Sequence, residues 1–115
     1  MFILACITDF FFQTKVSETA RQISAPIRMV SSGSQFELEL GDHPSLIIVD
    51  LAAGGVDSLA LIARARNDLP DTPVVAFGAH VDSELLEQAA QAGARALSRS
   101  KFTRLLPEIL AQALA

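Results

Sequence analysis

Two carboxylates stand where two apolar segments of the chain end. Asp9 comes two residues after the apolar run at residues 2–7, and Asp50 closes the β-branched run at residues 46–50. If these runs are neighbouring strands, the carboxylates lie close together, and a cation or a cationic side chain must offset their charges. Oxygen ligands of this kind suit Mg²⁺, which takes one or two carboxylates and retains water. A single Asp at a strand end is more often a turn or cap residue. The interpretation of Asp9 and Asp50 as cation ligands therefore depends on the two carboxylates lying close together.

The elements that must position these carboxylates alternate regularly along the chain. Short apolar runs typical of buried strands occur at residues 2–7, 27–30, 46–50, 73–78 and 95–98. Apolar residues at helical spacing predict helices at about residues 11–24, 35–40, 59–69, 83–92 and 102–113. Such alternation requires crossover connections between parallel strands. We therefore expect an α/β fold: a doubly wound, five-stranded parallel sheet with helices on both faces, of the flavodoxin-like class.

In a doubly wound sheet the functional residues lie beyond the carboxyl ends of the strands. The residues predicted to close the strands are Thr8, Asp9, Asp50, Gly78, Ala79 and Ser100. The predicted core includes Ile3, Ala5, Ile7, Ile47, Val49, Val75, Ala89, Leu105 and Ile109. The site and the core should therefore share the same strands.

Composition limits the classes of function. The chain has 115 residues, of which 50% are hydrophobic, and we expect one domain over residues 1–115. A formal net charge of −4 opposes binding to nucleic acid. One cysteine and two distant histidines form neither an internal disulfide nor a zinc cluster. No segment approaches the roughly 20 apolar residues of a membrane span, so we expect a cytoplasmic protein with neither nucleic acid nor membrane as partner.

Nearly the whole sequence resembles the receiver domain of two-component response regulators. The run Ile48-Val49-Asp50-Leu51, followed by the loop at residues 55–58, resembles the phosphoacceptor strand and its loop. Residues 72–80 resemble the fourth strand, and residues 92–94 resemble the approach to the fifth. The order and spacing of these pieces make the resemblance specific. It implies the flavodoxin-like receiver fold, with Asp50 at the position of the phosphorylated aspartate.

The metal site implied by this resemblance is incomplete. Receiver domains hold Mg²⁺ with two acidic residues after the first strand, and this chain has Thr8 and Asp9 there. The implied ligands are therefore Asp9, Asp50 and the backbone carbonyl of Ala52. We expect no certain cofactor, and a weak Mg²⁺ site at most.

The implied phosphate site is also degenerate. Receiver domains use a Thr or Ser hydroxyl at the end of the fourth strand, where this chain has Gly78. The family's lysine-proline pair after the fifth strand aligns with Ser100 and Lys101, so the lysine is absent or displaced by one residue. Leu97 stands at the family's aromatic switch position.

These losses predict a stand-alone pseudo-receiver, a signalling domain that acts through protein–protein interaction and is not an enzyme. The expected partner is a signalling protein such as a histidine kinase or another receiver, and a homodimer is a further expectation. The alternative is a working phosphoreceiver in a phosphorelay, with Asp50 phosphorylated in the presence of Mg²⁺ and with Lys15, Lys101 or Arg99 as the cation. A flavodoxin-like cofactor-binding enzyme is less favoured, because the segment after the first strand has neither a flavin phosphate loop nor Gly-x-Gly-x-x-Gly.

Three consecutive aromatic residues follow Asp9, at positions 10–12. One helix can bury one or two of them, so Phe10 and Phe11 are either part of the core or a contact patch. His80, after the fourth strand, is either an anion donor or a loop residue without a chemical role. We therefore keep Phe10, Phe11 and His80 as candidate interaction residues.

Overall fold

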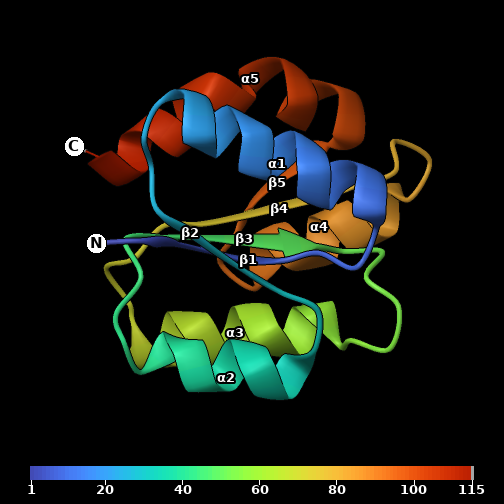
Figure 1. Cartoon of the computed structure of the whole chain (residues 1–115). Coiled ribbons are helices and arrows are strands. Elements are labelled where there is room, and N and C mark those ends of the chain that lie inside the picture. The colour runs from blue at the N-terminus through green and yellow to red at the C-terminus, as the bar shows by residue number, and fades with distance from the viewer. Residues whose placement is uncertain (115) are drawn as a thin grey trace.

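The computed structural model describes residues 1–114 as a five-stranded parallel sheet between two layers of helices (Figure 1). The strands are β1 (Ile3–Cys6), β2 (Ile27–Val30), β3 (Leu46–Asp50), β4 (Val74–Gly78) and β5 (Arg95–Ser98). The helices are α1 (Phe10–Gln22), α2 (Gly33–Leu40), α3 (Ser58–Asp68), α4 (Ser83–Gln91) and α5 (Arg99–Ala111), and a 3₁₀ turn covers Gln112–Leu114. The predicted doubly wound, flavodoxin-like fold is confirmed.

The strand order places the two candidate carboxylates at one point of the sheet. The order is β2-β1-β3-β4-β5, and every pairing is parallel. The chain moves outward from β1 to β2 and then returns to place β3 on the other side of β1. The strand order therefore reverses between β1 and β3, which is where parallel sheets of this kind bind their ligands. Asp50 ends β3 at this point, in register with Phe77 of β4.

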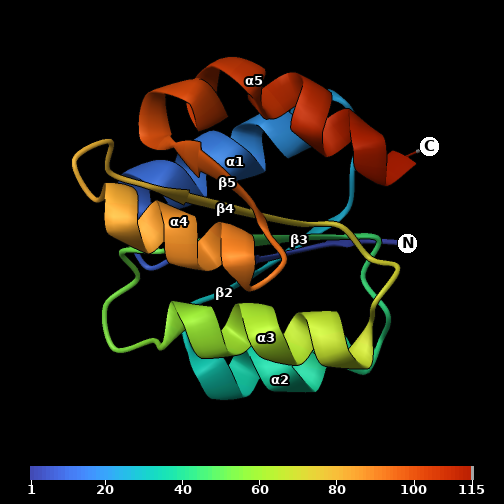
Figure 2. The same ribbon diagram turned by 180° about the vertical axis from the view of Figure 1, so that it is seen from behind.

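Alternation along the strands divides the core between the two faces of the sheet. Residues such as Ile3 and Ile48 pack against α1 and α5, whereas Leu4 and Ile47 pack against α2, α3 and α4. Figures 1 and 2 show α1 and α5 together over one face, with α2 and α3 over the other. The predicted core residues are buried except Leu105, which is half-buried on α5. The strands are therefore covered on both sides, as their apolar composition indicated.

A line of aromatic rings joins α1, β4 and α5 on the first of these faces. The ring centroids of Phe12 and Phe77 are 5.0 Å apart, and Phe77 stacks on Phe102 at 4.2 Å with an interplanar angle of 11°. Phe11 meets Phe12 edge-on at 5.3 Å. Phe12 is thus the aromatic residue of the 10–12 run that packs inward.

Capping residues move the starts of three helices from their predicted positions. Asp9 caps α1 by accepting the N–H of Phe12 at 3.0 Å, so α1 begins at residue 10 rather than 11, and it ends at Gln22 rather than 24. Ser32 caps α2 in the same way, so α2 begins at residue 33 rather than 35. Ser98 caps α5 through the N–H of Lys101 at 3.3 Å, and α5 begins at residue 99 rather than 102. Within residues 1–114, no helix is long and apolar enough to span a membrane.

Candidate functional site

Asp50 is a buried carboxylate at the end of β3. The residue is 2% exposed, and its Oδ1 accepts the backbone N–H of Ala52 at 2.9 Å. Its backbone carbonyl accepts the hydroxyl of Ser58, the first residue of α3, at 3.0 Å. These two contacts hold both the side chain and the main chain of Asp50 in place where β3 enters its loop.

Burial governs the ionisation of Asp50. Loss of solvent raises the pKa of Asp50 above its ordinary value, and the nearby charge of Asp9 raises it further. The Ala52 hydrogen bond and the positive charge of Arg99 act in the opposite direction. Burial, together with the charge of Asp50, also raises the pKa of the Cys6 thiol to about 11. Cys6 is therefore a neutral core residue at physiological pH.

Asp9 and Ala52 both act on Asp50: the charge of Asp9 raises the pKa of the Asp50 carboxyl, and the backbone N–H of Ala52 donates to it. Asp9 is exposed and lies directly before α1, where its Oδ1 is already used as the helix cap. Within residues 1–114, no group of three or more His, Cys, Asp or Glu side chains is arranged to hold a metal ion. Two carboxylates and a carbonyl still match the oxygen ligands that Mg²⁺ takes when it retains most of its water. The residues present fit a sparse Mg²⁺ site.

Thr8 stands beside this pair but serves the loop after β3. Its Oγ1 accepts the backbone N–H of Gly54 at 3.0 Å, across a sequence separation of 46 residues. The position that would carry a second acid therefore joins the end of β1 to the β3–α3 loop. Sequence reasoning did not predict this contact, because no local pattern signals a bond between such distant residues.

Gly78 ends β4 and faces leucine side chains. A Cβ added to Gly78 would lie 3.3 Å from Cδ1 of Leu51 and 3.7 Å from Cδ2 of Leu86. Leu51 is itself buried. Leucine side chains therefore lie next to the position where a hydroxyl side chain would begin. No pattern in the sequence predicts that Leu51 packs there.

Ser100 was expected at a strand end, and this was wrong. Strand β5 ends at Ser98, which also caps α5, so Ser100 and Lys101 lie in the first turn of the helix and are exposed. Arg99 is the cation whose charge lowers the pKa of Asp50. Its guanidinium lies 5.9 Å from the ring centroid of Phe12. Of the three cations proposed as substitutes for the lysine, Arg99 is the one that acts on Asp50.

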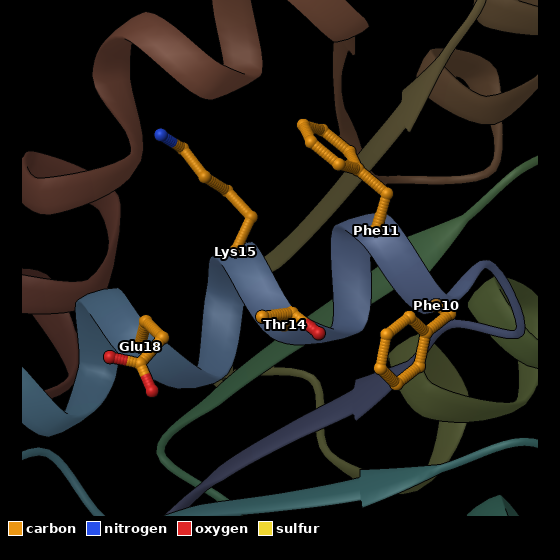
Figure 3. Close-up of a pocket in the computed structure, with 5 residues that line it drawn as sticks. All are labelled: Phe10, Phe11, Thr14, Lys15 and Glu18. Carbon is orange, nitrogen blue, oxygen red and sulfur yellow. The ribbon is translucent and has the colours of Figure 1, made fainter.

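The candidate interaction residues lie outside the carboxylate pair. Phe10 is 80% exposed and Phe11 is 66% exposed. A groove of about 390 Å³ on α1 is lined by Phe10, Phe11, Thr14, Lys15 and Glu18 (Figure 3). His80 is an exposed residue in the loop after β4. Phe10 and Phe11 are therefore exposed and not part of the core, whereas Phe12 packs against the core.

The chain is similar in sequence to two proteins of Pseudomonas putida. No protein-family model matches the chain. The glycerol metabolism activator of Pseudomonas putida is 32% identical over 109 residues, which are 90% of this chain and 45% of that protein. The transcriptional activator protein ExaE of Pseudomonas putida is 33% identical over 70 residues, which are 60% of this chain and 33% of that protein. The chain thus spans less than half the length of these curated relatives.

Solved structures match nearly the whole chain. The receiver domain of NtrX from Brucella abortus superposes with a TM-score of 0.84 and 21% identity, over 97% of both chains. The phosphorylated cyanobacterial phytochrome response regulator RcpA superposes with a TM-score of 0.83 and 15% identity, over 98% of this chain and 93% of that one. These likenesses confirm the fold that the sequence resemblance implied.

Proposed function

From the receiver fold of this chain, we propose that it is a degenerate receiver domain, which transmits a signal through protein–protein contact without the usual phosphorylation of Asp50. One observation carries the proposal: the end of β4 presents Gly78 against Leu51 and Leu86 instead of a hydroxyl group. Asp50 is buried among groups that position it, yet the donors needed around a phosphoryl group are missing.

The missing groups matter because of the charge that develops during phosphoryl transfer. Metal ions and cationic or hydroxyl side chains neutralise the transferred phosphoryl oxygens, and loss of one such contact costs ~3 kcal/mol of transition-state stabilisation. This chain has Gly78 in place of the hydroxyl residue, Ser100 in place of the lysine and Thr8 in place of the second acid. Arg99 compensates in part, since its charge acts on Asp50. Because three stabilising groups are missing and Arg99 replaces only one of them in part, we expect phosphoryl transfer to Asp50 to be slow or absent.

A Mg²⁺ ion would be held by Asp9, Asp50 and the Ala52 carbonyl. When bound, the ion would supply positive charge to the phosphoryl oxygens. Asp9 offers it one carboxylate oxygen that is not used in the cap of α1. Such a site would be weak, in keeping with its two carboxylates.

The partners of a degenerate receiver are other signalling proteins, such as a histidine kinase or a second receiver. The chain would then be a cytoplasmic regulatory domain and not an enzyme. The two similar proteins of Pseudomonas putida are both named as activators, and this supports a regulatory role. Net charge −4 supports protein rather than nucleic acid as the surface that the chain contacts.

A working phosphoreceiver is the second candidate function. It is favoured by the retention of Asp50 and Asp9 at one sheet edge, and by the action of Arg99 on Asp50. In that case Arg99 would take the place of the lysine in pairing with the phosphoryl group.

Intact-mass measurement separates the two candidates. The protein is treated with a small phosphodonor and Mg²⁺, next to an Asp50→Asn variant and a receiver domain known to accept phosphate. We expect the wild-type protein to remain largely unmodified while the known receiver gains one phosphoryl group. A substantial gain that disappears in Asp50→Asn would overturn the proposal and establish the working phosphoreceiver.

A reconstruction tests the same argument in the other direction. The double variant Gly78→Thr with Ser100→Lys restores a hydroxyl and an ammonium group, and we expect it to gain some phosphorylation on Asp50. The matched control is Gly78→Ala with Ser100→Ala, which adds the same Cβ at position 78 without either functional group. Circular dichroism checks that both variants fold, because the new side chain at position 78 requires Leu51 to shift by a few tenths of an ångström. Equal phosphorylation of both variants would contradict the role assigned to the missing groups.

A further inference from the structure

The charges of the chain are unevenly distributed. Residues 1–94 contain twelve acidic and five basic residues, whereas residues 95–107 contain four basic residues and no acid. The four are Arg95, at the start of β5, and Arg99, Lys101 and Arg104, within the first six residues of α5. A chain with a net charge of −4 therefore has one short segment that is strongly positive.

The three cations of α5 are exposed and unpaired. Arg99, Lys101 and Arg104 are all exposed, and we call them the α5 basic surface. Within residues 1–114, none of the three forms an ion pair with an acidic side chain. Arg99 acts on Asp50 through its charge, whereas Lys101 and Arg104 have no acid beside them. Their charges are therefore available to a partner.

The stability of α5 does not account for these cations. The N-terminus of a helix carries a partial positive charge, so acidic residues stabilise the first turn and basic residues destabilise it. The first turn of α5 has no acid and contains Arg99 and Lys101. Helix α4 shows the ordinary arrangement, with Glu84 in its first turn. The cations of α5 instead add to the positive charge of the helix end, and the α5 basic surface is a region of concentrated positive potential.

The spacing of the cations fits an extended acidic segment. Lys101 and Arg104 are three residues apart on a helix, so their Cβ atoms are about 5–6 Å apart. In an extended chain, side chains at alternate positions point to the same side at intervals of about 6.5–7 Å. A segment with acids at alternate positions therefore places one carboxylate beside each of these cations. A nucleic acid, by contrast, continues beyond the surface and is repelled by the excess of acids in residues 1–94.

We propose that the α5 basic surface is a docking site for an extended acidic segment of a partner protein, with carboxylates beside Lys101 and Arg104 and a further one near Arg99. The inference rests on the proposed interaction function, since it states the chemistry of the partner, but not on the phosphorylation of Asp50. Exposed ion pairs contribute little individually and are screened by salt. The complex is therefore weak and depends on ionic strength.

Fluorescence anisotropy with a labelled peptide tests this surface. The probe is a short peptide with Asp or Glu at every second position and Ser between them, and its control has Asn or Gln in place of each acid. We expect saturable binding of the acidic peptide that weakens as salt is added, and no binding of the control peptide. The double variant Lys101→Glu with Arg104→Glu should weaken binding by about tenfold or more. A wild-type protein that does not bind the acidic peptide, or a double variant that binds it equally well, would overturn the proposal.

A matched pair of single variants separates this surface from the net charge of the protein. Arg104→Glu and Arg95→Glu each reverse one exposed arginine that forms no ion pair. Arg95 begins β5, so it lies about 13 Å along the strand from the start of α5, farther than the ~8 Å over which exposed charges interact at physiological salt. Arg104→Glu should weaken peptide binding several-fold, and Arg95→Glu should bind like wild type. Equal losses would show that binding follows net charge alone, and this would contradict the proposed site.

A nucleic acid probe identifies the class of partner. A labelled single-stranded DNA with as many charges as the peptide is titrated under the same conditions. We expect the DNA to bind more weakly than the acidic peptide, because the rest of the chain repels it. Stronger binding of the DNA would overturn the assignment of a protein segment as the occupant. Circular dichroism checks that all variants remain folded.

The two proposals fail in distinguishable ways. A phosphoryl gain on Asp50 in a wild-type protein that also binds the acidic peptide contradicts the degenerate receiver and supports the α5 basic surface. A wild-type protein that binds no acidic peptide and takes no phosphate contradicts the docking site and supports the degenerate receiver.

Discussion

The hydroxyl of Thr8 accepts the backbone N–H of Gly54 at 3.0 Å, and this bond joins the end of β1 to the loop that follows Asp50. Thr8 stands at the position where the family resemblance implies a second acid. Its observed contact gives the residue a structural role, because it holds the β3–α3 loop beside Asp9 and Asp50.

Thr8→Val removes this bond while keeping the shape of the side chain. We expect the free energy of unfolding to fall by about 0.5–1.5 kcal/mol, the net contribution of one such hydrogen bond. Urea denaturation measures the change. The control is Thr103→Val on α5, whose hydroxyl forms no hydrogen bond with residues 1–114. Equal losses in the two variants would show that the Thr8 bond has no special effect.

Asp50→Asn should stabilise the fold at neutral pH. Burial raises the pKa of Asp50 above 3.8, so the folded state holds the proton more strongly than the unfolded state. The stability contributed by the protonated form is complete below 3.8 and is lost as the pH rises through the folded pKa. The gain of the neutral variant should therefore be present at pH 7 and vanish near pH 3.

Urea denaturation at several pH values measures this pH dependence. Asp82→Asn serves as control, because Asp82 is exposed and its side chain makes no cap hydrogen bond. If the increase in the free energy of unfolding of Asp50→Asn is the same from pH 3 to pH 7, the ionisation of Asp50 is not its cause.

Arg99→Gln should raise the pKa of Asp50 further. The positive charge of Arg99 lowers this pKa in the native protein, whereas burial and the charge of Asp9 raise it. Without Arg99, the two effects that raise the pKa are less well balanced. Titration of the Asp50 side-chain carboxyl carbon by NMR gives the value directly. Arg95→Gln, on the exposed surface of β5, is the matched control. An unchanged Asp50 titration in Arg99→Gln would mean that another group provides the positive charge.

Gly93→Ala should destabilise the protein by roughly 1–3 kcal/mol. Gly93 has φ +108°, and a Cβ there would lie 2.9 Å from Cγ of Arg66. Both the backbone conformation and the contact with α3 therefore require glycine. Gly54→Ala is the control, since a Cβ at Gly54 meets nothing within 4 Å. Thermal unfolding of the two variants should differ clearly, and similar melting temperatures would contradict the explanation.

Ile47→Asp should unfold the domain. Ile47 is fully buried in β3, and an unpaired charge there costs a large part of the ~5–15 kcal/mol that stabilises a domain. Leu38→Asp, at a residue that is 79% exposed, should leave the far-ultraviolet circular dichroism spectrum unchanged. A folded Ile47→Asp protein would mean that β3 is not a central strand.

The sequence by itself determined the fold class and the composition of the candidate site. Short apolar runs that alternate with helical periodicity permit few architectures other than a parallel sheet covered on both faces. Asp9 and Asp50 were predicted to meet because the carboxyl ends of neighbouring parallel strands share one edge. The absence of a hydroxyl at Gly78 and of a lysine at Ser100 is also a property of the residues themselves.

Only the tertiary structure decided how these residues act. Thr8 binds Gly54, Leu51 covers Gly78, and Arg99 rather than Lys101 acts on Asp50. The start of α5 was also decided by the tertiary structure, since the Ser98 cap places it at residue 99. Helix caps depend on which of several short polar side chains has the right backbone conformation. Contacts across 46 residues depend on loop closure and packing, which leave no periodic trace along the chain.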